Sequence, residues 1–253
     1  MTYIEGFVIA VPTANKQRFI DHARRGDAVF VEHGALRVLE CWQSDVPKGQ
    51  VTDFFGAVDA REDESVVFSW MEWPDKATRQ AMTERMPELM RTDPRFDPEK
   101  NPMPFDGARM IYGGFEAIVE HGQPTPGAYV QGFLLAVPDA NKEAYRKLAE
   151  ESWQTFQRFG ALRIVEAWQD DVPEGKQTDF FRAVKTQPGE KVVFSFIEWP
   201  SRAVWETAAK RMEAEMQPPP ADQMPFDGKR MIYGCFESVV ELTREGAPAS
   251  GAR

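Results

Sequence analysis

The sequence lacks most of the features that would assign the chain to a membrane, a nucleotide cofactor or a secretory route. No run of apolar residues approaches the length of about eighteen that a membrane-spanning helix requires. The N-terminus has no basic segment followed by an apolar stretch, so we expect no signal peptide. Dinucleotide-binding glycine patterns, P-loops, GxSxG and HExxH are missing from the sequence. We therefore expect a cytoplasmic protein that uses no cofactor.

Cysteine and histidine are scarce. The two cysteines, Cys41 and Cys235, form no CxxC motif, and this usage is typical of a reducing compartment. The three histidines (His22, His33 and His121) do not fall at the spacing of metal ligands. We therefore expect no metal site built from cysteine and histidine.

Basic residues are fewer than acidic ones, 30 against 40, and the formal net charge is −10. An acidic chain repels phosphate groups, and duplex binding normally requires a clustered basic face. The densest basic group, at 22–25, is absent from the second half of the chain. We expect neither nucleic acid nor a membrane surface as a partner. By contrast, 42% of the residues are hydrophobic and 12% aromatic, which predicts a bulky core.

The chain contains one sequence twice. Three segments of the first half return in order in the second: Tyr3–Pro12 as Tyr129–Pro138, Thr52–Phe55 as Thr178–Phe181, and Met103–Gly107 as Met224–Gly228. A period of this length indicates a whole repeated domain rather than a solenoid unit. We predict a first repeat at 1–120, a Pro/Gly-rich linker at 121–128, a second repeat at 129–242 and a disordered tail at 243–253.

Hydrophobic periodicity predicts the elements of one repeat. They are strand 3–11, helix 15–33, strand 35–43, strand 66–73, helix 75–90 and strand 110–119, with 52–60 open between a capped helical turn and a short strand. This β-α-β-β-α-β order is the ferredoxin-like pattern. The strands are apolar on both faces, so the face without helices needs a cover. We predict an α+β fold in which two ferredoxin-like repeats pack sheet to sheet as an intramolecular dimeric α+β barrel.

Several uncommon strings also carry a resemblance. Gly-Ala-Leu-Arg at 34–37, Val-Val-Phe-Ser at 66–69 and Met-Pro-Phe-Asp-Gly at 103–107 occur in the right order to resemble the YbaA-like family, small bacterial proteins of unknown function in the dimeric α+β barrel superfamily. The resemblance covers nearly all of each repeat. It implies the fold and assigns no reaction. Family members look like one copy that dimerises, so this chain looks like a fused pseudo-dimer, and further oligomerisation stays open.

Carboxylates on apolar strand faces are the main candidates for chemistry. Glu40 and its equivalent Glu166 each alternate with apolar side chains, and in Glu40's strand these are Val38 and Trp42. Burial at such a position raises the pKa of a carboxyl group, which is how a general base is made. The alternatives are solvent access at a strand end or an ion pair with Arg37/Arg163 or Arg109/Arg230. Glu72 and Glu198 have the same alternatives, and Asp53 and Asp179 are expected to cap helical turns.

Three further kinds of residue complete the predicted site. Arg37 and Arg163 could orient an anionic substrate, although strand parity places Arg37 on the face opposite Glu40. Tyr112 and Tyr233 could orient a carbonyl or carboxylate, or each could be a core tyrosine with one hydrogen bond. His33, which the second repeat lacks, could transfer protons in an asymmetric site.

We therefore weigh two functions. The first is a cofactor-independent enzyme, monooxygenase-, isomerase- or lyase-like, that acts on a small apolar or aromatic molecule in a barrel pocket. The second is a non-catalytic small-molecule-binding or stress-related protein whose carboxylates are structural. A cavity of a few hundred cubic ångströms that reaches solvent beside Glu40 or Glu166 would favour the enzyme, and its absence would favour the non-catalytic protein.

Overall fold

The computed structural model describes residues 2–216, 220 and 223–244. The first repeat contains β1 (Tyr3–Pro12), α1 (Lys16–Glu32), β2 (Arg37–Asp45), α2 (Phe54–Ala57), β3 (Glu64–Trp73), α3 (Lys76–Thr92) and β4 (Ile111–Gly122). The second contains β5 (Tyr129–Pro138), α4 (Lys142–Arg158), β6 (Arg163–Asp171), α5 (Phe180–Ala183), β7 (Glu190–Trp199), α6 (Arg202–Glu215) and β8 (Ile232–Thr243). The predicted helices and strands are confirmed, and short 3-10 turns lie between some of them.

Two of the predicted domain boundaries fall elsewhere in the structure, and the strand and helix ends shift by a few residues. β4 continues to Gly122, so the connection to β5 is shorter than the predicted linker at 121–128. Strand β8 includes Thr243, and the rest of the predicted disordered tail, beyond Arg244, lies outside the described residues.

Local sequence signals explain where the helices begin and end. Asp75 caps α3 by accepting a hydrogen bond of 2.7 Å from the backbone N–H of Thr78. Asp53 caps α2 in the same way, accepting from Gly56 at 2.7 Å, so the segment left open at 52–60 is a capped helical turn. Gly34 follows the end of α1 with φ at +119°, a left-handed backbone conformation that favours glycine.

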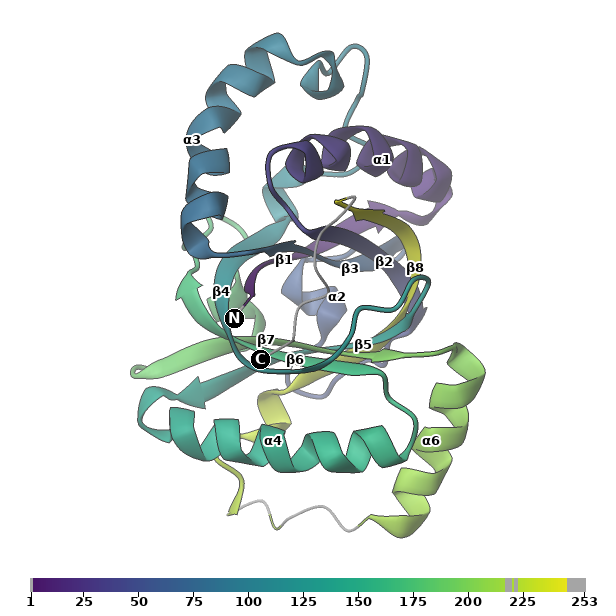
Figure 1. Cartoon of the computed structure of the whole chain (residues 1–253), viewed down its shortest axis with the longest axis vertical. Helices are drawn as coiled ribbons and strands as arrows, with labels where there is room; N and C mark the ends of the chain where they lie inside the picture. The colour runs from purple at the N-terminus through teal and green to yellow at the C-terminus, as the bar shows by residue number, and fades with distance from the viewer. Residues whose placement is uncertain (1, 217–219, 221–222, 245–253) are drawn as a thin grey trace.

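The strands form one closed antiparallel barrel in the order β1-β3-β2-β8-β5-β7-β6-β4. Four neighbouring strands come from each repeat, and the edge strands β2 and β4 pair with β8 and β6 of the other repeat. The two sheets thus join edge to edge as well as facing each other, which satisfies the backbone groups that free edges would expose. α1 and α3 cover one side of the barrel, and α4 and α6 cover the other (Figure 1).

Aromatic side chains occupy the axis of the barrel. Phe68 stacks on its equivalent Phe194 with ring centroids 4.5 Å apart, and Trp70 stacks on its equivalent Phe196 at 3.9 Å. A Cβ atom added at Gly6 would lie 2.5 Å from the ring of Phe194, so any larger residue there would displace that ring. These rings fill the place where the sequence predicted a ligand pocket.

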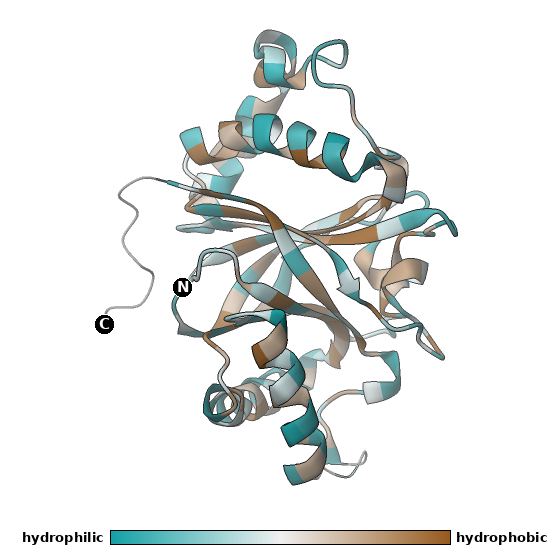
Figure 2. Cartoon of the chain, turned by 90° about the vertical axis from the view of Figure 1, so that its right-hand side faces the viewer, coloured by the Kyte–Doolittle hydropathy of each residue, from teal (hydrophilic) through white to brown (hydrophobic). Residues whose placement is uncertain are grey.

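Hydrophilic residues are frequent along the helices, and hydrophobic residues are frequent along the strands (Figure 2). Within the described ranges, no helix combines the length and the apolar character that crossing a bilayer demands.

Candidate functional site

Four buried charged side chains close one end of the barrel interior. Arg37 lies 2.6 Å from Glu198 and 3.3 Å from Glu72, and Arg163 lies 2.8 Å from Glu72 and 3.1 Å from Glu198. Each arginine therefore makes its shorter contact with the glutamate of the other repeat. Burial alone would raise the pKa of Glu72, but the two guanidinium groups outweigh it and lower this pKa to about 2.

This cluster accounts for both arginines. Their side chains are almost completely buried and already bind carboxylates. The ion pair that the sequence offered as an alternative for Glu72 and Glu198 is therefore present, and the arginines have a structural role in it. At the opposite end of the axis, α2 and α5 contact each other, and Phe54 and Phe180 join the core. The barrel interior is thus closed by packing at both ends.

Glu40 lies on the outer face of the sheet, beneath α1. Its side chain is buried, with 6% of the residue exposed, and it accepts a hydrogen bond from Ser69. Its second neighbour is Asp27 of α1, whose carboxyl group hydrogen-bonds that of Glu40. Two carboxyl groups can hydrogen-bond each other only if one of them keeps a proton. Burial and the neighbouring Asp27 raise the pKa of Glu40 well above its usual range.

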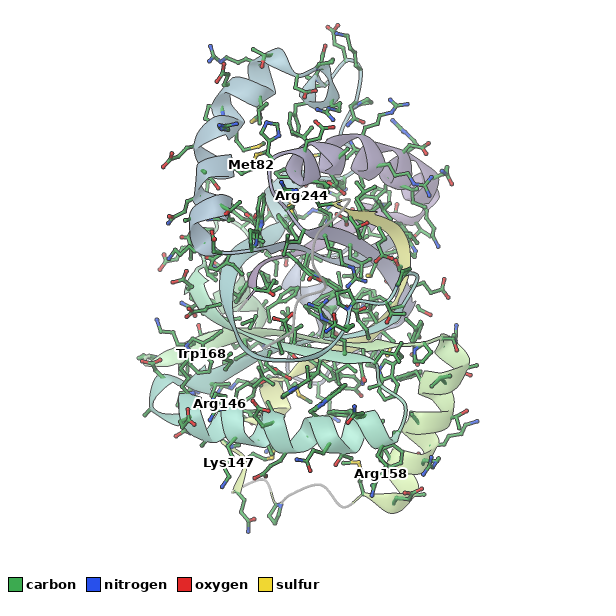
Figure 3. All side chains as sticks on the ribbon, in the orientation of Figure 1. Met82, Arg146, Lys147, Arg158, Trp168 and Arg244 are labelled. Atoms are coloured by element: carbon green, nitrogen blue, oxygen red, sulfur yellow. The ribbon has the colours of Figure 1, made fainter. Side chains whose placement is uncertain are left out.

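Glu166 occupies the equivalent place beneath α4 but has different partners. The phenol of Tyr145 donates a hydrogen bond of 2.5 Å to Glu166 Oε2, and Ser195 provides a second hydrogen bond. Burial raises the pKa of Glu166 to about 7, and these two hydrogen bonds act against that rise. Side chains of the helices and of the sheet meet between them in both halves of the barrel (Figure 3).

Neither Glu40 nor Glu166 forms an ion pair with any residue that the structure describes. The other three glutamates that are buried in the described ranges each contact an arginine: Glu72, Glu198, and Glu64, which lies 2.6 Å from Arg109. The ion-pair alternative is therefore wrong for Glu40 and Glu166. The parity argument is confirmed, because Arg37 points into the barrel and Glu40 points out of it.

Tyr112 and Tyr233 lie at the surface, with 43% and 48% of each residue exposed. Each lines a hollow formed by both repeats, of about 230 Å³ beside Tyr112 and about 340 Å³ beside Tyr233. Lys176 lines the first hollow and Lys48 the second. Neither buried glutamate lines these hollows. The alternative of a core tyrosine is wrong, and the structure does not bring the tyrosines together with Glu40 or Glu166.

His33 also lies away from the buried carboxylates. It forms the C-cap of α1, and its Nδ1 atom hydrogen-bonds the carbonyl oxygen of Val29 at 2.8 Å. It lines a separate hollow of about 460 Å³ with Arg85 and Arg244. Of the predicted site residues, Glu40 and Glu166 are the ones buried without an ion pair, whereas Arg37 and Arg163 are buried in the ion cluster.

Sequence reasoning missed Asp27, Tyr145 and the two serines. Asp27 follows Phe19 and Ala23 at helical spacing, so it continues the apolar stripe of α1 that faces the sheet. An acid on such a stripe is the signal that could have found it. Among the described residues, no group of three or more histidine, cysteine or acidic side chains is arranged to hold a metal ion.

Comparisons with known proteins agree with the repeat and the barrel. The uncharacterized protein YbaA of Escherichia coli K12 is 51% identical over 120 residues, which cover 47% of this chain and 99% of YbaA, and the Shigella flexneri protein matches equally. Crystal structures of a proposed monooxygenase from Lactobacillus acidophilus and of an anthrone oxidase-like protein each cover 99% of the chain, with a TM-score of 0.57 and 11% identity. The alignments also cover 99% and 96% of those two proteins, respectively. At this low identity, the likeness shows a shared fold. The family model described as "Protein of unknown function (DUF1428)" matches residues 2–107 and again 128–228, and the chain therefore belongs to this family with two copies of its domain.

Proposed function

We propose that the protein is a cofactor-independent enzyme, monooxygenase-, isomerase- or lyase-like, that moves a proton on a small apolar or aromatic molecule. The proton acceptor would be the buried glutamate of the second strand of a repeat, Glu40 or Glu166. One observation carries the proposal: these two carboxyl groups are buried without a cation, while the other buried glutamates of the described residues contact arginine.

The cost of burying such a group supports a functional role. An unpaired carboxylate in an apolar layer costs several kcal/mol unless it keeps its proton, and an apolar side chain of similar size would avoid that cost. A carboxyl group whose pKa lies near neutral pH can accept a proton and return it during one reaction cycle. Glu166, with a pKa of about 7, has this property. Strongly perturbed carboxyl groups are enriched at functional sites for this reason.

The position of the glutamates indicates where a substrate would bind. Packed rings occupy the barrel axis, so the substrate would lie in the layer between a helix and the outer face of the sheet. The strand order β2-β3-β1-β4 within the first repeat, and its equivalent in the second, supports treating each repeat as a ferredoxin-like unit with its own such layer. The oxidase-like and monooxygenase-like neighbours share the barrel, and this supports the enzyme class by fold analogy alone.

The proposal is tested by identifying what the protein binds. Native mass spectrometry of protein purified without denaturation would be compared between the wild type and the Glu40→Gln/Glu166→Gln double variant, and the released small molecules would be identified. We expect the double variant to lose turnover of the identified compound. The matched control is Glu151→Gln, an exposed glutamate on α4. A double variant that binds and converts the compound normally would remove these residues from the site. Binding without any conversion by the wild type would support the non-catalytic alternative.

A further inference from the structure

We propose that the second hollow, the one beside Tyr233, binds a small aromatic carboxylate at a site separate from the buried glutamates. The carboxylate of the ligand would contact Lys48 and Lys229, and its ring would lie against the phenol ring of Tyr233. All three residues line this hollow, which has a volume of about 340 Å³. The inference goes beyond the proposed function, because neither Glu40 nor Glu166 lines the hollow.

Both repeats build the second hollow. Residues within 47–53, the loop that follows β2, form one part of its lining, and residues within 228–233, which lead into β8, form the rest. The pairing of β2 with β8 brings these two segments together. The Thr52 hydroxyl also donates a hydrogen bond to the carbonyl oxygen of Ala183 in the second repeat. The hollow is therefore formed before a ligand arrives, which lowers the entropic cost of binding.

Lysines gather around the second hollow, although the chain as a whole has a net charge of −10. Lys48 and Lys229 line it, and Lys185 donates a hydrogen bond to the carbonyl oxygen of Val51, another residue of the lining. The lysines that form ion pairs among the described residues are three others: Lys76, Lys100 and Lys147. Lys48 Nζ lies 3.8 Å from the centroid of the Phe55 ring, a contact that leaves its charge in place. All three charges beside the hollow can therefore attract an anion.

The equivalent hollow beside Tyr112 provides an internal comparison. Three positions that carry lysine around the second hollow carry other residues around the first: Glu174 in place of Lys48, Ala108 in place of Lys229, and Asp59 in place of Lys185. Lys176, which lines the first hollow, stands where the second has Gln50. Two lysines and one acidic residue thus line the second hollow, against one lysine and two acidic residues in the first. The difference favours an anion in the second hollow alone.

Asp53, the acidic residue in the described lining of the second hollow, is already engaged by the backbone. Its carboxylate accepts hydrogen bonds from the N–H groups of Gly49 at 3.0 Å and of Gly56 at 2.7 Å. Hydrogen bonds of this kind stabilise the charged carboxylate and compensate part of its negative charge. Asp53 therefore opposes the lysines less than an unengaged carboxylate would.

Tyr233 gives the second hollow an aromatic face. The residue is 48% exposed, and its hydroxyl has no hydrogen-bond partner among the described residues. Tyr112 stacks on Phe7 with ring centroids 6.4 Å apart, whereas no ring in the described part of the chain stacks on Tyr233. A free ring face attracts an aromatic body, and a free phenol can donate a hydrogen bond to a carboxylate. Together with the lysines, these groups suit a ring that carries a negative charge.

Benzoate is the probe, and saturation-transfer NMR measures its binding to the full-length protein. The volume of the hollow lies near the lower end of the range for ligand pockets, about 300–1,000 Å³, so a molecule of one or two rings fits. We expect saturable binding with a dissociation constant of about 1 mM or lower. Benzamide lacks the charge and cyclohexanecarboxylate lacks the aromatic ring, and each should bind about fivefold more weakly or worse.

Matched variants locate the probe. Lys48→Glu/Lys229→Ala gives the second hollow the residues of the first and should weaken benzoate binding about tenfold or more. Tyr233→Leu keeps an apolar side chain without the ring and should weaken binding about fivefold. The control is Lys176→Ala in the first hollow, which should leave the affinity unchanged. The replaced side chains are all exposed, so each variant should keep the thermal unfolding midpoint of the wild type.

Each outcome has a distinct meaning. Unchanged benzoate binding in Lys48→Glu/Lys229→Ala, or weaker binding in Lys176→Ala, would overturn the assignment to the second hollow. Benzamide or cyclohexanecarboxylate binding as tightly as benzoate would overturn the anionic or the aromatic part of the ligand class. Absence of saturable binding by the wild type would overturn the site as a whole. None of these results depends on Glu40 or Glu166, so this inference and the proposed function fail separately.

Discussion

Glu166→Gln should change the pH dependence of stability in a calculable way. Glu166 has a pKa of about 7 in the folded protein, because burial disfavours its charged form, whereas the ordinary pKa of a glutamate is 4.5. Between these values the unfolded chain releases the proton while the folded protein keeps it, so the free energy of unfolding falls as pH rises. The full stability contribution is present below about pH 4.5 and is lost as pH passes through about 7.

The size of the effect follows from the shift. Each pKa unit corresponds to about 1.4 kcal/mol, so this shift corresponds to a loss of about 3 kcal/mol between pH 4 and pH 8. Glutamine does not titrate and can still accept the hydrogen bond from Tyr145. We therefore expect the variant to gain about 3 kcal/mol relative to the wild type across this range.

Urea unfolding followed by circular dichroism, at intervals between pH 4 and pH 8, measures this difference. Subtracting the variant from the wild type at each pH removes the contributions of Asp27, Glu40 and all other titrating groups. Glu151→Gln on the same helix is the control, and its difference should stay within about 0.5 kcal/mol because the site is exposed. A wild-type minus Glu166→Gln difference that does not vary with pH would refute the reasoning.

Three further changes test the packing around the site. Arg163→Met should lower the free energy of unfolding by about 3–5 kcal/mol, because it leaves Glu72 buried with weaker neutralisation; an unchanged urea midpoint would contradict this. Gly6→Ala should cost about 1–3 kcal/mol by forcing the ring of Phe194 from its place, as differential scanning calorimetry would detect. Asp75→Ala should cost about 1 kcal/mol by removing the cap of α3, and Asp75→Asn should recover most of it.

The sequence was sufficient for the elements and the repeat because those depend on local periodicity. The strands are apolar on both faces, and this predicted that the face of each sheet without helices needs a cover. The family resemblance predicted the barrel. Pairing of β2 with β8 could not be predicted, because register between distant edges depends on tertiary geometry. The aromatic packing along the barrel axis was not predicted either. Phe68 stacks on Phe194, the equivalent residue of the other repeat, only when the two repeats come together.

The candidate site was predictable in part. Strand parity placed Glu40 opposite Arg37 and so identified a carboxylate that this arginine cannot neutralise. The partner that each buried carboxyl group finds was not predictable, because Arg37 contacts Glu198 only after the two repeats have met. Neither the role of Asp27 nor that of Tyr145 was predictable, since helical spacing reports which face is buried and not what a polar group on it will touch.

The edge pairing of β2 with β8 and of β4 with β6 has a consequence for how the protein can change by mutation. In a symmetric dimer built from a single repeat, one substitution in the first helix appears on both sides of the barrel at once. In this chain the same substitution appears once, because the two halves of the barrel are encoded separately. The second half can therefore hold the closed barrel together while the first accumulates changes that would be too destabilising in duplicate. The first repeat has Asp27 at the position where the second has Trp153, and a symmetric dimer of one repeat could not keep this difference.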